Sequence, residues 1–202
     1  MPIIPSAITG FTMAKAFSKG IVGSDMRKVA SAVASASTQY IIAASNVIST
    51  NVVLGPGSGV STGKLIGLIP SVMSNLMFVR GVPLGIAGRD AKKLFDSISF
   101  GVVMGLQTAI SQGSVIGGGP GTGVGNIVGL IPSALQALIR PFLAGKLVVG
   151  SYSGKMASAI AFGITTHVMT AGKIIYTDVG AVAPPPVGPV PIPAAPGYGR
   201  IL

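Results

Sequence analysis

The chain has 202 residues and a formal net charge of +10, yet only 9% of its residues are charged and 49% are hydrophobic. Soluble monomers normally carry about a quarter charged residues, so this composition argues against a free-standing soluble protein. It indicates a surface that other subunits or lipid cover. The absence of cysteine excludes a disulfide framework and a thiolate metal site. The positive charge favours anionic partners, such as DNA or an acidic protein surface.

In chain order, the sequence predicts a short helix, a longer helix and two short strands, and this order occurs three times, with a proline-rich arm in place of the second strand in the third occurrence. A proline followed by a serine opens the short helices, because proline loses no hydrogen bond in a first turn. The longer helices carry an apolar stripe, as at Val29, Val33 and Ala36. The expected short helices are 6–19, 71–80 and 133–140, the longer helices are 24–48, 89–112 and 152–171, and the strands are 52–54, 64–68, 114–116, 126–130 and 173–176.

An internal repeat accounts for this recurring order. Residues 67–71 (GLIPS) occur again as residues 129–133, and with a shift of 65 residues Ile4-Pro5-Ser6 falls on Ile69-Pro70-Ser71. We therefore expect three tandem units of about 62–65 residues within one domain. The boundaries are 1–68, 69–130 and 131–182, followed by a Pro/Gly-rich C-terminal arm, 183–202.

The two ends of the chain complete the repeat. The last residues, PGYGRIL, read like the glycine-rich phrases before the second and third units, and the chain begins with MPIIPS. We expect the arm to close onto the first unit. The expected fold is α+β and mainly helical, with three units closed into a pseudo-threefold disc; an open two-helix solenoid is the alternative. The prolines of residues 183–199 favour an extended polyproline arm that cannot join a central strand.

The glycine-rich phrase GPGSGVSTGK, residues 55–64, looks like a phosphate-binding loop but fails its pattern. Ser58 stands where the first glycine is required, and Leu65 stands where a hydroxyl should follow the lysine. We interpret the phrase as a joint between packed units, which recurs because the joint recurs. The residues assigned to the joints are Pro5, Pro70, Pro132, Gly67 and Gly129.

Lys28, Lys93 and Lys155 occupy the same position in each of the three units. On a closed disc they would form a triangle of positive charge, to which Arg27 and Lys92 add in the first two units. One interpretation is a ring that faces an anion or a partner, with DNA as one such partner. The other is a solvated first-turn lysine on each helix.

The sequence offers no means for catalysis. His167 is the only histidine and has no acidic neighbour in sequence to orient it. Four scattered Asp residues form neither a metal site nor a carboxylate pair. We expect a protein that is not an enzyme and that binds no cofactor and no metal.

Two long stretches, 29–63 and 97–139, carry no charge and exceed the length of a membrane span. Each is broken by Gly-Pro-Gly and by polar residues, whose backbone would be unsatisfied in lipid. A membrane-inserting or pore-forming protein therefore stays an alternative rather than the first expectation.

In character, the whole chain resembles the small virion structural proteins of contractile-tailed bacteriophages. The resemblance lies in the missing cysteine, the low-charge body rich in Gly, Ala, Ser and Val, the joints GPGSGV and GPGTGVG, and the arm APPPVGPVPIPAAPGYG. It implies a non-enzymatic structural subunit in the virion's tail, baseplate or hub, assembled in the host cytoplasm and bound to other structural proteins of the particle. A capsid-associated vertex or decoration protein is an alternative.

Overall fold

The computed structural model describes residues 3–44, 46–53, 59–116, 122–178 and 195–201. The fold is α+β and mainly helical, as the sequence predicts. Helices and strands follow one another in the order α1 (Pro5–Ser18), α2 (Ser24–Ala44), β1 (Asn46–Val53), β2 (Gly59–Ile66), α3 (Pro70–Gly81), a 3₁₀ turn (Val82–Leu84), α4 (Arg89–Thr108), β3 (Ile110–Ile116), β4 (Thr122–Val128), α5 (Pro132–Gly145), α6 (Ser153–Ala171), β5 (Lys173–Asp178) and β6 (Ala195–Ile201).

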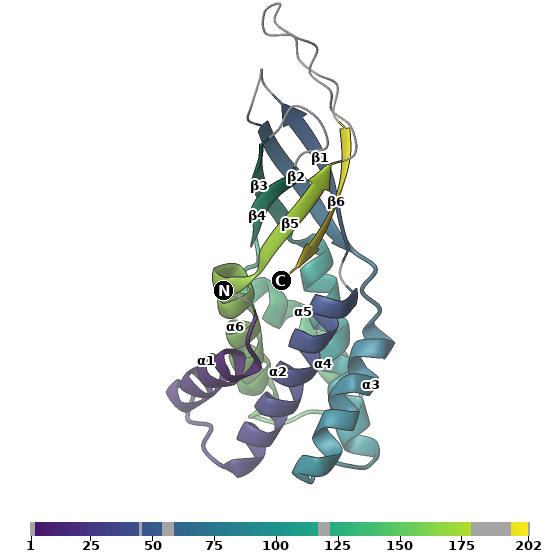
Figure 1. The fold of residues 1–202 in the computed structure, drawn as a ribbon. Coiled ribbons are helices and arrows are strands. Elements are labelled where there is room, and N and C mark those ends of the chain that lie inside the picture. The colour runs from purple at the N-terminus through teal and green to yellow at the C-terminus, as the bar shows by residue number, and fades with distance from the viewer. Residues whose placement is uncertain (1–2, 45, 54–58, 117–121, 179–194, 202) are drawn as a thin grey trace, which may run out of the picture.

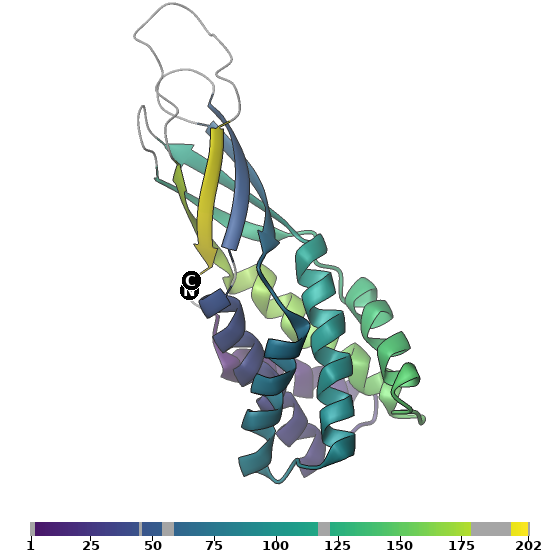
Figure 2. The same ribbon diagram turned by 90° about the vertical axis from the view of Figure 1, so that its right-hand side faces the viewer.

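The strands and the helices form two stacked layers. Each strand pairs antiparallel with the next, and β6 pairs with β1, so the six strands close into a barrel. Each helix packs against its neighbours in the chain, and α6 packs against α1, which closes a ring of helices below the barrel. Figures 1 and 2 show an elongated molecule, with the barrel at one end and the helices at the other. The shape therefore differs from the flat disc expected from the sequence.

The strands are longer than the sequence indicates, and two helices are shorter. The first and second long helices end at Ala44 and Thr108, four residues before the expected ends. The residues that follow alternate in exposure, as Val47 and Ser49 are buried while Ile48 is exposed. Such alternation is typical of a strand with one buried face. The residues that were expected to form the last turn of each helix therefore pair as strands instead.

The glycine-rich phrase is mostly strand, not a link, which corrects our interpretation of it as a joint. Residues 59–66 form β2, and Ser61, Gly63 and Leu65 face the barrel interior. A Cβ on Gly63 would lie 2.7 Å from the Ile48 carbonyl oxygen and from Ser111 Oγ. The barrel is thus too narrow for a side chain at this position, and glycine marks the close approach of a neighbouring strand. Residues 55–58 lie outside the described part.

The expectation that the proline-rich arm cannot join a central strand is wrong for its end. Residues 195–201 form β6, which pairs with β1 on one side and β5 on the other. Pro196 is tolerated because it is the second residue of the strand, before the pairing with β5 begins at Gly197. Residues 183–194 lie outside the described part.

One continuous hydrophobic core runs from the barrel into the helices. Matching positions of the predicted units are buried in it together. At the base of the barrel the three even-numbered strands contribute Leu65, Ile127 and Ile201, and the residues before the odd-numbered helices contribute Ile3, Leu68 and Leu130. The even-numbered helices contribute Val33, Ile98 and Ile160 near their middle, and Ile41, Leu106 and Val168 near their ends.

Two glycines let neighbouring helices approach closely. A Cβ on Gly101 of α4 would lie 2.8 Å from the Ile139 Cα of α5, and one on Gly163 of α6 would lie 2.8 Å from the Ile8 carbonyl oxygen of α1. A glycine within a helix costs about 1 kcal/mol relative to alanine, so its presence there calls for a packing reason. Here the reason is direct contact between backbones, including the contact that closes the ring.

The three links between consecutive helices have the same backbone geometry. Gly20, Gly85 and Leu147 adopt φ angles of 74°, 81° and 61°. The next amide in each link donates to a carbonyl five residues back, at 2.9 Å from Ile21 to Ala16, at 3.0 Å from Ile86 to Gly81, and at 2.9 Å from Val148 to Leu143. This is the left-handed C-terminal cap that glycine favours.

Leu147 is the one described non-glycine residue with a positive φ, and its side chain is 79% exposed. Leu147→Gly is expected to stabilise the fold by about 0.5–1 kcal/mol, because the left-handed strain of about 1–2 kcal/mol exceeds the entropic cost of glycine. Thermal unfolding followed by circular dichroism measures the change. Leu147→Ala is the control, since it removes the exposed side chain but keeps the strain. Equal stabilisation by both variants would contradict this explanation.

Candidate functional site

The end of the helical ring away from the barrel is the candidate site. One residue separates α2 from β1, α4 from β3 and α6 from β5, so these three helices end at the barrel and begin at the far end. Three residues separate β2 from α3 and β4 from α5, so these helices begin at the barrel and end at the far end. Figures 1 and 2 show the resulting helix ends and links at the pole opposite the barrel.

Positive charge is concentrated within about two helical turns of this far end, which we call the basic pole. Eleven of the 14 Lys and Arg residues lie there against three of the four Asp, an excess of eight positive charges. The cations are Lys15, Lys19, Arg27, Lys28, Arg80, Arg89, Lys92, Lys93, Arg140, Lys146 and Lys155, and the acids are Asp25, Asp90 and Asp96. The remaining charged residues lie in strands of the barrel.

The predicted lysine triangle lies on this pole, at the first turns of α2, α4 and α6. Two of its members are paired: Lys28 Nζ lies 3.2 Å from Asp25 Oδ1, and Lys93 Nζ lies 3.2 Å from Asp90 Oδ1. Lys155 instead lies 5.3 Å from the centre of the Tyr152 ring. The surface ion pairs contribute little to stability, and they reduce the local charge without removing it.

Lys92 also lies on this pole, and its ammonium group is engaged between two helices. Its Nζ lies 2.7 Å from Asp96 Oδ1 and 2.9 Å from Ser74 Oγ, so it joins α4 to α3. Ser74 also donates a hydrogen bond to Asp96. Partial burial would raise the pKa of Asp96, but the hydrogen bonds from Lys92 and Ser74 and the charges of Lys92 and Lys146 outweigh it and lower this pKa. Arg27 is exposed, and it lines a shallow pocket beside Lys28.

An apolar pocket of about 500 Å³ opens on the basic pole. Val29 of α2, Leu94 of α4 and Met156 of α6 line it together, so it lies where the starts of the three even-numbered helices meet. Residues of two helix links complete the wall, among them Ile21, Val149 and Tyr152. Sequence reasoning missed this pocket, although Val29, Leu94 and Met156 stand one residue after Lys28, Lys93 and Lys155.

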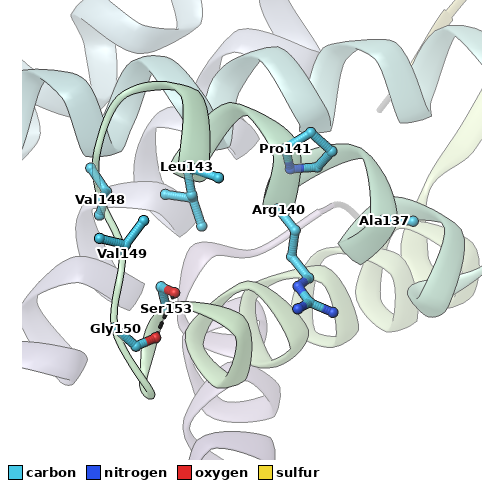
Figure 3. Close-up of a pocket in the computed structure, with 9 residues that line it drawn as sticks. Ala137, Arg140, Pro141, Leu143, Val148, Val149, Gly150 and Ser153 are labelled. Carbon is cyan, nitrogen blue, oxygen red and sulfur yellow. Dashed lines mark hydrogen bonds between the residues drawn. The ribbon is translucent and has the colours of Figure 1, made fainter.

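A second pocket of about 590 Å³ lies beside it, between α5 and α6 (Figure 3). Val148, Val149 and Gly150 line both pockets, so this link forms the wall between them. Arg140 reaches from α5 over the start of α6, where a Cβ on Gly154 would lie 3.6 Å from its Nε. Ser153 Oγ donates to the Gly150 carbonyl at 2.8 Å and fixes the turn into α6.

The predicted joint residues lie where the barrel meets the helices. Pro5, Pro70 and Pro132 are each the first residue of a helix, as expected of proline. Gly67 and Gly129 have φ angles of 83° and 84°, which favour glycine. These residues set the direction in which the chain leaves the barrel, and they provide no chemical group for a reaction.

His167 and Tyr40 bind the backbone at two of these joints. The Ile4 amide donates to His167 Nε2 at 2.8 Å, and the Ile69 amide donates to the Tyr40 hydroxyl oxygen at 2.8 Å. His167 is almost fully buried, and burial lowers its pKa. An acceptor role at Nε2 requires the neutral ring. His167 is therefore a structural hydrogen-bond acceptor. The internal repeat places it at the position of Tyr40 in the first unit, and the sequence gives no other sign of this role.

Over the described ranges, no group of three or more His, Cys, Asp or Glu side chains could hold a metal ion. Among the helices of those same ranges, none has the length and apolar character that a bilayer crossing requires. Comparisons with protein families, with curated proteins and with solved structures found no match to this chain.

The pKa of His167 makes the stability dependent on pH. Because the folded state lowers this pKa, the stabilisation is fully present above the ordinary histidine pKa of about 6.5 and is lost as the pH falls below it. We expect the melting temperature to drop between pH 7 and pH 5. His167→Gln, which keeps an acceptor but does not titrate, should flatten the curve over this interval. An equally steep curve for this variant would contradict the assignment.

Proposed function

We propose that this protein is a non-enzymatic structural subunit of a large assembly. In this proposal it serves as a pseudo-threefold junction in the tail, baseplate or hub of a contractile-tailed phage particle. The single observation that carries the proposal is a barrel closed by pairing of the first and last strands, whose outer wall exposes apolar side chains on several strands.

Recurring geometry supports the pseudo-threefold part of the proposal. The order helix, helix, strand, strand occurs three times, and the positive φ angles of Gly23, Gly88 and Gly150 fall at matching positions of the three links. The residues before the odd-numbered helices, Ile4, Ile69 and Ile131, have φ angles of −118°, −116° and −112°. Because the first and last parts also pair, three equivalent faces would surround one axis.

Exposed apolar side chains support the assembly part of the proposal. On the outer wall of the barrel they include Val60, which is 58% exposed, and Val124, which is 53% exposed. Neighbouring strands add Ile48, Ile66, Ile110 and Ile175. Isolated exposed apolar residues are ordinary, but a wall of them on several strands favours contact with another protein.

The geometry also gives reasons to propose a structural role over catalysis. The buried histidine accepts a backbone hydrogen bond at Nε2 and lies in the packed joint below the barrel. Ser74, Lys92 and Asp96 satisfy one another between α3 and α4. In both arrangements the polar groups are taken up by contacts that join one part of the fold to another.

Circular permutation tests the closed pseudo-threefold organisation. A chain that runs from residue 129 to residue 202, then through one glycine to residue 3, and ends at residue 128 is expected to fold with nearly the original melting temperature. The new link would copy the one between β4 and α5, and the new ends would lie at an equivalent joint. Circular dichroism and size-exclusion chromatography measure the outcome. An unfolded permutant would contradict the three-part organisation.

Particle fractionation tests the place of the protein. Quantitative mass spectrometry of purified virions, isolated tails and empty heads is expected to find the chain in virions and tails and not in heads. Its copy number should be far below that of a tube-forming subunit, because a particle needs only a few copies of a junction that lies on its axis. Retention in empty heads would instead indicate a capsid-associated protein, and absence from virions would contradict the proposal altogether.

A further inference from the structure

We propose that the basic pole binds an acidic protein segment that inserts an apolar side chain into the pocket formed by Val29, Leu94 and Met156. This inference names a partner for one end of the proposed structural subunit, and it rests on that structural role.

The pocket is apolar in its floor and in part of its rim. The three floor residues come from three different helices, and Val149 and Tyr152 stand at the rim with 70% and 60% of their surfaces exposed. Two further apolar residues, Val22 and Leu147, are 72% and 79% exposed on the adjoining links. Exposed apolar side chains around an apolar cavity are typical of a protein-binding site whose partner supplies an anchor residue.

The surroundings of the pocket select the charge of the partner. The basic pole has an excess of eight positive charges, and all three of its acids are already engaged with lysines: Asp25 with Lys28, Asp90 with Lys93, and Asp96 with Lys92. Asp25 is the one charged residue in the pocket's described lining, and it is paired with Lys28. Arg27 and Lys155 each adjoin a lining residue in sequence, Met26 and Met156, and both are exposed without a carboxylate partner in the described part of the chain. A partner that is acidic around its anchor would satisfy these cations, and it would approach faster through electrostatic attraction.

Nucleic acid shares the charge of this partner but not its anchor. The phosphate backbone would be attracted to the basic pole, but it offers no aliphatic group to fill an apolar pocket of about 500 Å³. Bases that stack on proteins require aromatic platforms, and Tyr152 is the only aromatic residue that lines this pocket in the described structure. The pocket and the charge together therefore favour an acidic polypeptide over DNA.

The test measures binding of defined probes to the full-length protein by fluorescence anisotropy. The first probe is a labelled synthetic peptide rich in Asp and Glu with one central leucine. The second is the same peptide with serine in place of leucine, and the third is a random-sequence DNA duplex. Two protein variants probe the site: the pair Val149→Ser and Tyr152→Ser for the rim, and the pair Arg27→Gln and Lys155→Gln for the charge. Val60→Ser and Lys64→Gln on the barrel are their matched controls, and circular dichroism verifies that all variants fold.

We expect the leucine peptide to bind, and its affinity to fall about tenfold or more for the serine peptide and for the rim variant, since a buried aliphatic anchor contributes at least that much. The charge variant should weaken binding and reduce its dependence on salt, while both barrel controls leave it unchanged. Equal affinity for the leucine and serine peptides would overturn the inference, as would no binding at all. If the DNA duplex binds more tightly than the leucine peptide, and the rim variant binds the duplex equally well, the inference would also be overturned, in favour of a nucleic-acid surface. Because these measurements use the isolated chain, their failure is distinct from absence of the protein in virions.

Discussion

Closure of the chain on itself is the constraint on which the rest of the structure depends. The closure happens twice, once in hydrogen bonds where β6 pairs with β1, and once in side-chain packing where α6 meets α1. An open sheet of six strands would leave two edges with unpaired backbone groups, and a closed barrel has none. The closed barrel in turn brings one end of every helix to its base, the starts of α1, α3 and α5 and the ends of α2, α4 and α6. The circumference of the helical ring and the circumference of the barrel therefore depend on each other.

A narrow barrel sets strict demands on the residues inside it. Gly63 sits against the backbone of β1 and the side chain of Ser111, and Gly125 takes the same inward position on β4. Larger residues are admitted only at the base, where Leu65 and Ile127 join the helical core. A narrow barrel on a packed helical ring requires small residues inside and apolar residues in the core. The sequence is accordingly rich in glycine and serine and also hydrophobic. Glycine and serine face the described part of the lumen at Gly63, Ser61 and Ser111, and valines and isoleucines such as Val60, Val124 and Ile48 face outward.

The sequence predicted the fold class, the order of the helices and the proline at each short helix, because these depend on local patterns. It located five of the six strands but underestimated the length of most of them and missed β6, since a strand with alternating glycines carries little hydrophobic signal of its own. It also failed on the arm, because nothing local says that Pro196 falls where a strand can tolerate it. At the candidate site, the three lysines could be found by alignment, but the pairing of two of them with Asp25 and Asp90 and the engagement of Lys92 with Ser74 and Asp96 depend on geometry. The apolar pocket required the three helices to be assembled in space.

Where β6 pairs with β1 and α6 packs against α1, the closing seam is held by noncovalent contacts alone, while every other pair of neighbouring strands or helices is also consecutive along the chain. Ile3 and Ile201 are both buried near this seam. A load applied between the two poles would be shared by all of the strands, but a torque that unwinds the barrel would concentrate on this one line. The seam is therefore the line along which the barrel and the ring would open, because no chain connection crosses it.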